Sequence, residues 1–369
     1  SLAEVSDVPL SLSEGAKPNI VFILDNSGSM GWEFMPDGIS GDYRDEFYFS
    51  SRVNGVWFDP SVQYQPPISQ DGSGRMPNAG YENAWDDGYD QTGSVDLSEE
   101  LPHRGQDFTS FRPSPGTASD GAFYFEFNEG DPNCDEGADD RNNNCYSLVE
   151  VNEITTVNNE RARVQQNFAN WYSYYRTRMF ASRAGIAEAF EELGEGVRLG
   201  WGQINGGTLV EGVRVFGDGA SQGFRQWLYG ANPGGGTPLR TALDDIGEYY
   251  EDDSDSGPWS DNPEEGDSEN PHVACRQSFS ILMTDGFYNG PGPGVGNQDD
   301  SSGSTITDDG GGGTFQYTPD DPFSDGRSNT LADVAMRYWK TDLRSDLDNL
   351  VPSSDLNPAF WQHMVTYGV

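Results

Sequence analysis

Three separate segments of the sequence carry oxygen-bearing side chains at points where buried strands or helices are expected to begin or end. Asp25 follows the apolar run 20–24 directly, and two serine hydroxyls follow it within four residues. Thr237 comes after three consecutive glycines, and Asp285 comes after a second strand-like run, 280–284. Carboxylates and hydroxyls are hard oxygen ligands, which suit Mg²⁺ or Ca²⁺ rather than Zn²⁺.

Open α/β sheets bind ligands at the carboxyl ends of their strands, so these side chains are expected to meet at one edge of a sheet. The sequence therefore predicts a divalent-cation site there, with Mg²⁺ favoured and Ca²⁺ or Mn²⁺ as alternatives. A different interpretation treats Asp25 and Ser27 as an ordinary polar turn, and Thr237 as a helix N-cap before Pro238.

The order Asp-x-Ser-x-Ser, then Thr, then Asp resembles the metal-ion-dependent adhesion site of von Willebrand factor A domains. This resemblance implies that the metal shell consists of Asp25, Ser27, Ser29, Thr237 and Asp285. It implies a doubly wound, Rossmann-like α/β sheet. It also implies a bound ion that offers an open coordination position to an acidic group on a protein ligand or a surface. The expected role is binding, not catalysis.

The alternation of apolar strands and amphipathic helices favours the same α/β fold class, with large irregular insertions. Strands are expected at 20–24, 197–204, 208–216, 280–284 and 364–367, and short strands at 47–49 and 122–127. Helices are expected at 166–193, 222–229, 238–250 and 330–343. The last of these helices begins with a sequence similar to a capping box at Thr330.

Residues 1–369 are assigned to one von Willebrand factor A-like domain. Its core is expected at about 18–30 and 166–369, with one insertion at 31–165 and a second at about 289–326. Loops of this length are normally functional. Because a sheet of this type would continue with another helix and strand, we expect the domain to be cut short at its carboxyl end.

The charge balance excludes two classes of partner. The chain has 61 acidic and 21 basic residues and a formal net charge of −40, so neither nucleic acid nor an anionic membrane surface is an expected partner. It contains no apolar run of about 18 residues, so no membrane-spanning helix is expected. The start Ser1-Leu2-Ala3-Glu4 resembles a mature end left after removal of a signal peptide, which favours secretion.

The three cysteines allow several pairings. Cys134 and Cys145 lie in a polar loop rich in Asn and Asp, where a short disulfide explains them better than core packing does. Cys275 precedes the strand that ends near Asp285. A bridge between Cys134 and Cys145 is favoured, but a bridge that includes Cys275 and three free thiols both stay open.

Two further motifs are weaker. Asp131, Asn133 and Asp135 begin like a calcium loop, but its glycine comes one place late and Asn142 stands where the bidentate Glu should be. They are kept as a weak second metal site, with an ordinary acidic loop as the alternative. The segment 219–223 matches the Gly-x-Ser-x-Gly nucleophile elbow, yet it lies in a polar loop away from the end of a strand, so no catalytic residue is assigned.

Several phrases along almost the whole chain are similar to the amino-terminal region of the PilC/PilY family, the adhesins at the tips of bacterial type IV pili. In family order they are 16–20, 31–34, 58–60, 64–67, 167–172, 285–290, 330–336 and 361–364. The resemblance implies a cell-surface protein at the pilus tip that sits on minor pilins, promotes pilus assembly and contacts surfaces. It also implies a β-propeller beyond the present carboxyl end.

Two other functions stay open at this point. One is a secreted A-domain adhesin unrelated to pili. The other is a metal-dependent hydrolase that uses Asp25 or Asp285 as its base, although no histidine is near any predicted ligand in the sequence.

Overall fold

The computed structural model describes residues 15–104, 110–111, 121–134 and 140–369, which form two compact units. The first unit comprises the described residues up to Asn26 together with Leu193–Ser221 and Gly235–Val369. The second unit comprises Ser27–Glu192 and Gln222–Gly234. No helix in the described part of the chain is long and apolar enough to cross a membrane.

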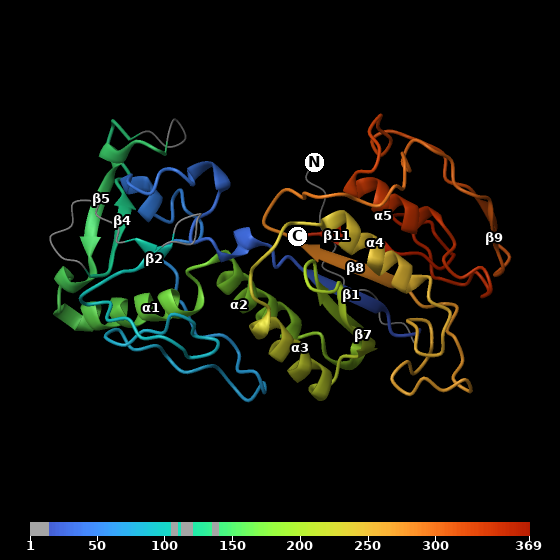
Figure 1. Cartoon of the computed structure of the whole chain (residues 1–369), viewed down its shortest axis with the longest axis horizontal. Coiled ribbons are helices and arrows are strands. Elements are labelled where there is room, and N and C mark those ends of the chain that lie inside the picture. The colour runs from blue at the N-terminus through green and yellow to red at the C-terminus, as the bar shows by residue number, and fades with distance from the viewer. Residues whose placement is uncertain (1–14, 105–109, 112–120, 135–139) are drawn as a thin grey trace. The chain divides into compact units, whose positions relative to one another are not determined.

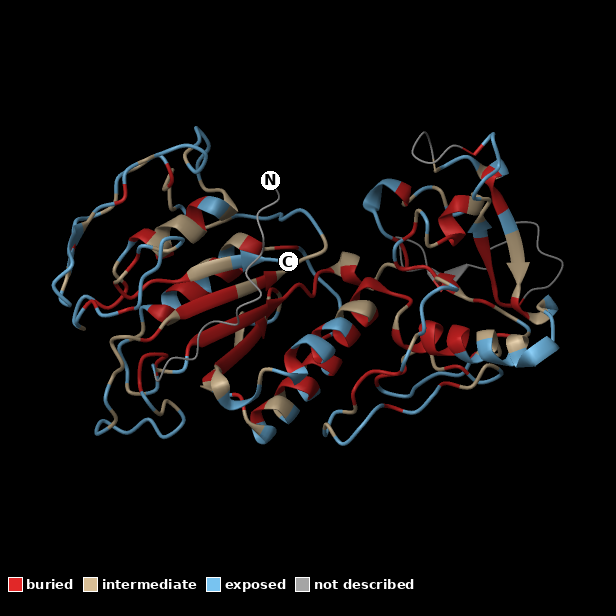
Figure 2. Cartoon of the chain, turned by 180° about the vertical axis from the view of Figure 1, so that it is seen from behind, coloured by how far each residue is buried: buried red, intermediate tan, exposed pale blue. Residues whose placement is uncertain are grey.

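The first unit is built on a five-stranded sheet in the order β11-β8-β1-β6-β7. All neighbouring strands are parallel except β7, which runs antiparallel to β6. The strands are β1 Asn19–Leu24, β6 Arg198–Gln203, β7 Leu209–Val215, β8 Ser278–Met283 and β11 Val365–Gly368. Every residue of β1 is buried, which explains its unbroken apolar sequence, and Figure 2 shows the central strands in red. The predicted α/β class with a mostly parallel sheet is therefore confirmed.

Two helices, α4 Leu239–Tyr250 and α5 Leu331–Lys340, lie side by side against this sheet (Figure 1). The apolar side of α4, including Leu243 and Ile246, is buried in one core with Val21 and Leu282. The ring of Tyr338 packs directly on Gly247, where a Cβ atom would lie 2.2 Å from the ring. The capping box expected for α5 is present between Thr330 and Asp333.

His363, just before β11, is a buried histidine whose two ring nitrogens both take part in hydrogen bonds. Its Nδ1 lies 2.6 Å from the carbonyl oxygen of Trp361, and its Nε2 lies 2.8 Å from Nδ2 of Asn357. The first bond requires a proton on Nδ1, and the second requires none on Nε2, so the neutral ring satisfies both. Burial accordingly lowers the pKa of His363 from 6.5 to about 4.

We therefore expect His363 to make a pH-dependent contribution to the free energy of unfolding. Because the folded state binds the proton less well than the unfolded state, the contribution is complete above pH 6.5 and is lost as the pH falls toward 4. The loss should amount to about 3 kcal/mol. Urea unfolding of wild type and His363→Gln at several pH values across this window measures it. The variant should lose less stability on acidification, and equal losses would contradict the assignment.

The second unit is built around aromatic side chains rather than a large sheet. It contains α1 Glu160–Tyr174, α2 Arg178–Glu191 and two antiparallel strand pairs, β4 Phe123–Phe127 with β5 Tyr146–Glu150 and β2 His103–Arg104 with β3 Ser110–Phe111. Its buried aromatic core is formed by Phe34, Phe47, Tyr48, Phe49, Trp57, Phe58, Phe123, Tyr124, Phe125, Tyr146, Phe168, Trp171 and Tyr172.

Two element predictions in this unit are wrong. The helix expected at 166–193 is two helices, because Thr177 caps α2 by accepting a hydrogen bond from the N–H of Phe180 at 3.0 Å. The strand expected at 47–49 is a 3-10 helix, Glu46–Phe49, in which three successive aromatic side chains are all buried. A strand facing solvent on one side would alternate instead.

The sequence predicts that the segment from 166 onward belongs to the same domain as the sheet. In the structure α1 and α2 belong to the second unit, together with residues 31–165. The reason is packing: the ring centroids of Phe168 and Phe58 lie 4.8 Å apart, and those of Trp171 and Trp57 lie 5.1 Å apart. The segment 31–165 therefore shares one aromatic core with α1.

The remaining elements are short or peripheral. Helix α3 spans Asp218–Gly230, and β9 Ile306–Asp308 pairs antiparallel with β10 Gly313–Phe315 inside the segment expected to be irregular. The other 3-10 helices are Gly28–Gly31, Asp37–Ile39, Asn143–Cys145, Val151–Glu153, Val157–Asn159 and Gly194–Gly196.

Candidate metal site

The two predicted carboxylate ligands follow neighbouring strands of the first unit. Strands β1 and β8 are parallel and in register, with Leu24 opposite Met283. The N–H of Asp25 donates to the carbonyl of Met283 at 2.9 Å, and the hydroxyl of Thr284 donates to Oδ2 of Asp25 at 2.7 Å. Asp25 is fully buried and Asp285 is half-buried. The pairing thus delivers both carboxylates to the carboxyl edge of the sheet.

Thr237 is tied to the same edge through the loop that follows Asp285. The N–H of Thr237 donates to Oδ1 of Asn289 at 2.9 Å, and the N–H of Asn289 donates to the carbonyl of Thr237 at 2.9 Å. Helix α4 begins only at Leu239 and has no side-chain N-cap bond. The alternative interpretation of the sequence required Thr237 to be the N-cap of this helix, and in the structure it is not.

Two asparagines that the sequence analysis did not assign hold neighbouring loops of this edge together. The N–H of Asn205 donates to Oδ1 of Asn26 at 2.9 Å, and Nδ2 of Asn26 donates to the carbonyl of Asn205 at 3.3 Å. Nδ2 of Asn205 also donates to the carbonyl of Gly236 at 2.8 Å. Each lies two residues after the end of its strand, β1 or β6, and this position is the one sequence signal that marks them.

The two serines of the motif lie in the second unit, at the start of the 3-10 helix Gly28–Gly31. Ser27 is buried and Ser29 is half-buried. Their hydroxyl oxygens lie 3.1 Å apart and share a hydrogen bond. Their part in a metal shell stays a prediction from the motif.

The side chains at this edge of the first unit are of the chemical type that a hard divalent cation binds. They comprise two carboxylates and a threonine hydroxyl, which are oxygen ligands. The bond from Thr284 orients the carboxylate of Asp25, as outer-shell groups orient metal ligands in general. Among the described residues no group of three or more His, Cys, Asp and Glu side chains converges as a transition-metal site would require.

An exposed aromatic side chain stands two residues beyond Asp285. Phe287 is 94% exposed, in the loop between Asp285 and Asn289. Arg240 of α4 holds this loop: its Nη2 donates to the carbonyl of Gly290 at 2.5 Å, and its guanidinium lies 4.7 Å from the ring centroid of Tyr288. Phe287 is thus displayed on an anchored loop.

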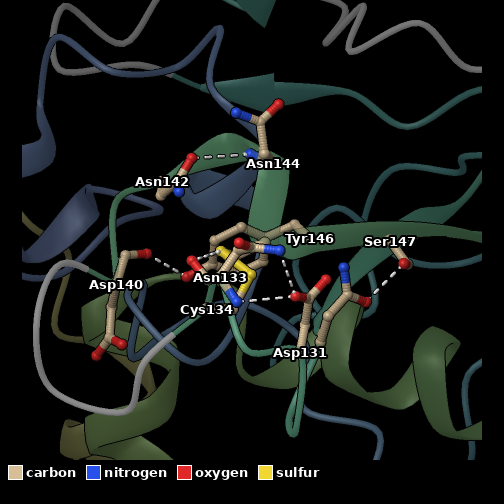
Figure 3. Close-up of a disulfide and its surroundings, with 10 residues drawn as sticks. Asp131, Asn133, Cys134, Asp140, Asn142, Asn144, Tyr146 and Ser147 are labelled. Atoms are coloured by element: carbon tan, nitrogen blue, oxygen red, sulfur yellow. Dashed lines mark hydrogen bonds between the residues drawn. A yellow bond between two sulfur atoms is a disulfide. The ribbon is translucent and has the colours of Figure 1, made fainter.

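The weak second metal site has a different local structure. Oδ1 of Asp131 accepts hydrogen bonds from the backbone N–H and the side-chain amide of Asn133, at 2.9 and 3.0 Å, which is how an Asp stabilises its own turn (Figure 3). Asp135 lies outside the described residues. A metal at this loop stays a prediction.

The structure joins Cys134 to Cys145 beside this turn, with their Cα atoms 5.5 Å apart, and leaves Cys275 outside the bridge (Figure 3). The favoured pairing is therefore the observed one. Both half-cystines are buried in the aromatic core of the second unit, although their sequence neighbours are polar. The bridge fastens the end of the polar loop to that core.

The Gly-x-Ser-x-Gly segment lies inside α3, not on a turn between strand and helix. The hydroxyl of Ser221 donates to the carbonyl of Asp218 at 3.0 Å, as serines in a first helical turn do. This geometry differs from that of a nucleophile elbow.

No protein-family model matches the chain, and no solved structure matches it. Several curated proteins do match the chain. The type IV pilus biogenesis factor PilY1 of Pseudomonas aeruginosa strain PAK is 34% identical over 98% of this chain. PilY1 of P. aeruginosa strain UCBPP-PA14 is 33% identical over 99% of it. The chain spans 32% of the length of each of these relatives. It is thus similar, along nearly all of its length, to about a third of a type IV pilus biogenesis factor.

Proposed function

We propose that this chain belongs to a type IV pilus biogenesis factor and binds a partner through a divalent cation at the carboxyl edge of its sheet. The observation that carries the metal site is the pairing of β1 with β8, in which Thr284 orients Asp25 and is followed directly by Asp285. The similarity to PilY1 along nearly the whole chain carries the assignment to pili.

Asp25, Thr237 and Asp285 of the first unit would hold the ion, and the part of Ser27 and Ser29 stays a prediction from the motif. Mg²⁺ is favoured, with Ca²⁺ or Mn²⁺ as alternatives. When bound, the ion supplies an open coordination position for a carboxylate of the partner. The order of these residues is that of a von Willebrand factor A domain, and we extend that assignment to this fold.

The residues around the ion have separate tasks. Thr284 fixes the orientation of Asp25, while Asn205 and Asn289 fix the loops before α4 and after β8. Phe287, exposed beside Asp285, offers an apolar contact to whatever carries the acidic group. The ligand would therefore combine a carboxylate with an apolar neighbour.

The same proposal places the protein at the cell surface, at the pilus tip, with minor pilins as partners. This location follows from the resemblance to the PilC/PilY family and from the relatives' description as pilus biogenesis factors. A role in binding is favoured over hydrolysis, because the two carboxylates are committed to the ion. The described contacts of the three histidines also lie away from these carboxylates. His103 contacts Glu33 and Tyr48, His272 contacts Asp255 and Arg344, and His363 contacts Trp361 and Asn357.

Deleting the gene in its own bacterium tests the pilus assignment. We expect fewer surface pili by electron microscopy and weaker attachment to a solid surface, because a biogenesis factor is needed before pili can attach. Reintroduction of the wild-type gene should restore both. Normal piliation and normal attachment in the deletion strain would remove the pilus assignment.

A further inference from the structure

The amino ends of three strands in the first unit carry buried polar side chains that the proposed metal site does not use. Asn19 begins β1 and Arg198 begins β6, and the two are register partners on neighbouring strands. Arg276 lies two residues before β8. All three residues are buried, with only 0 to 2% of their surface exposed. This edge of the sheet is the one opposite Asp25.

One short loop, 258–261, receives hydrogen bonds from all three side chains. Nδ2 of Asn19 donates to the carbonyl of Pro258 at 2.9 Å, and Nη1 of Arg198 donates to the carbonyl of Ser260 at 3.0 Å. Nη2 of Arg276 donates to Oδ1 of Asp261 at 3.3 Å. The two guanidinium groups therefore converge on adjacent residues of the same loop.

Four buried atoms around this loop have no hydrogen-bond partner within the described part of the chain. They are Nη2 of Arg198, Nε of Arg276, Oγ of Ser260 and Oδ1 of Asn19. The first three can donate a hydrogen bond. Buried polar atoms without partners are rare in folded proteins, and several around one loop require an explanation.

The charge of this cluster is also incompletely balanced. Burial, together with a smaller effect of nearby Arg198, lowers the pKa of Arg276 to about 10, and burial lowers the pKa of Arg198. Both groups stay positively charged at neutral pH. The carboxylate that pairs with Arg276 belongs to Asp261, whose side chain is 62% exposed and therefore well screened by water.

We propose that Arg198, Arg276 and Ser260 bind a small inorganic anion, of the size of chloride, at the amino edge of the sheet. Two guanidinium N–H groups and one hydroxyl supply the donors that such an ion accepts. The near-complete burial of these residues excludes a ligand with a large body, such as a carboxylate on a partner protein. The net charge of −40 repels anions only weakly here, because distant surface charges are screened by salt within about 10 Å.

The bound anion would fasten the acidic segment 251–271 to the sheet. Trp259 already anchors this segment, since its ring is fully buried and its Nε1 donates to the carbonyl of Tyr250 at 2.8 Å. An ion between Ser260 and the two arginines would add a second anchor one residue further on. This inference does not depend on the proposed metal site or on the pilus assignment.

Thermal unfolding of the whole chain at pH 7 tests the proposal, with sodium chloride compared to sodium gluconate at equal ionic strength. We expect Tm to rise with chloride and then to saturate, whereas gluconate, which is too large, gives no such rise. Crystals soaked in sodium bromide should show an anomalous peak beside Nη2 of Arg198 and Nε of Arg276. A wild-type protein with no peak and with equal Tm in both salts would overturn the proposal.

Two variants and a control assign the effect to these residues. Ser260→Ala removes one donor and should raise the chloride concentration at half-saturation about tenfold. Arg276→Gln should abolish the difference between the salts, whereas Arg327→Gln, at an exposed arginine, should preserve it. If Arg276→Gln does not fold, the chloride response of Ser260→Ala and the anomalous bromide peak test the assignment without it. An unchanged chloride response in Ser260→Ala, with no bromide peak, would overturn the assignment.

Discussion

Replacing Asp285 with alanine is expected to leave pili on the cell but to abolish their divalent-ion-dependent attachment. Asp285 is half-buried and follows the end of β8, so its carboxylate is not part of the buried sheet core. Loss of this carboxylate removes one of the two anionic ligands proposed for the ion and leaves β1 and β8 paired. The fold, and with it pilus assembly, should therefore survive while binding to a partner carboxylate fails.

The measurement is complementation of the deletion strain with wild type, Asp285→Ala and Asp355→Ala, followed by pilus counts and attachment assays with Mg²⁺ or with a chelator. Asp355 is an exposed aspartate of the same unit and serves as the matched control, so its variant should restore both phenotypes. Attachment by Asp285→Ala equal to that of wild type would contradict the adhesive role. Absence of pili in this strain would shift the role of the ion to assembly.

The second large effect is expected at a buried ion pair in the second unit. Nε of Arg176 lies 3.1 Å from Oε1 of Glu33, and both side chains are at most 5% exposed. Oε2 of Glu33 lies 2.6 Å from Nδ1 of His103, and Nη1 of Arg176 donates to the carbonyl of Tyr172 at 2.6 Å. Arg176→Met would remove the guanidinium of this buried pair from the carboxylate of Glu33, which should cost about 3–5 kcal/mol of unfolding free energy.

Urea unfolding followed by tryptophan fluorescence measures this loss. Arg75→Met is the matched control, because Arg75 pairs with Glu188 in the same unit but both side chains are more than 40% exposed; it should cost about 1 kcal/mol or less. The double variant Glu33→Gln with Arg176→Met should recover part of the loss, since it removes both charges. Similar losses for Arg176→Met and Arg75→Met would contradict the buried-pair account.

The sheet of the first unit could be predicted because its signals are local. The runs 20–24 and 280–284 are short and mostly apolar, and a polar residue follows each at once, so both their type and their carboxyl ends could be recognised in the sequence. Parallel pairing of such strands then brings Asp25 and Asp285 to one edge. Helix α4 likewise shows the spacing expected of a helix buried on one side.

The second unit could not be predicted in the same way because long-range packing determines it. The aromatic run 47–49 has strand propensity, yet it forms a 3-10 helix in which the ring of Phe49 packs against Trp57 and Phe123. The break between α1 and α2 depends on a single threonine cap at Thr177. Nothing in the spacing of residues 31–165 reveals that they share a core with α1.

Polar partners were the other feature that the sequence could not supply. Asn205 and Asn289 lie far from Asp25 in the chain and become neighbours of the candidate site only through the strand order. The convergence of Arg198 and Arg276 on one loop has the same cause, since each residue alone is an ordinary arginine near a strand start.

Isothermal titration calorimetry of Mg²⁺ and Mn²⁺ into wild type and Asp25→Ala tests the central claim most directly. We predict that wild type binds one ion and that Asp25→Ala weakens binding by about 100-fold or more, beyond the usual effect of an outer-shell residue. Circular dichroism should be nearly unchanged, because the variant removes a ligand and not an element of the sheet. Equal ion binding by wild type and Asp25→Ala would contradict the proposed metal site.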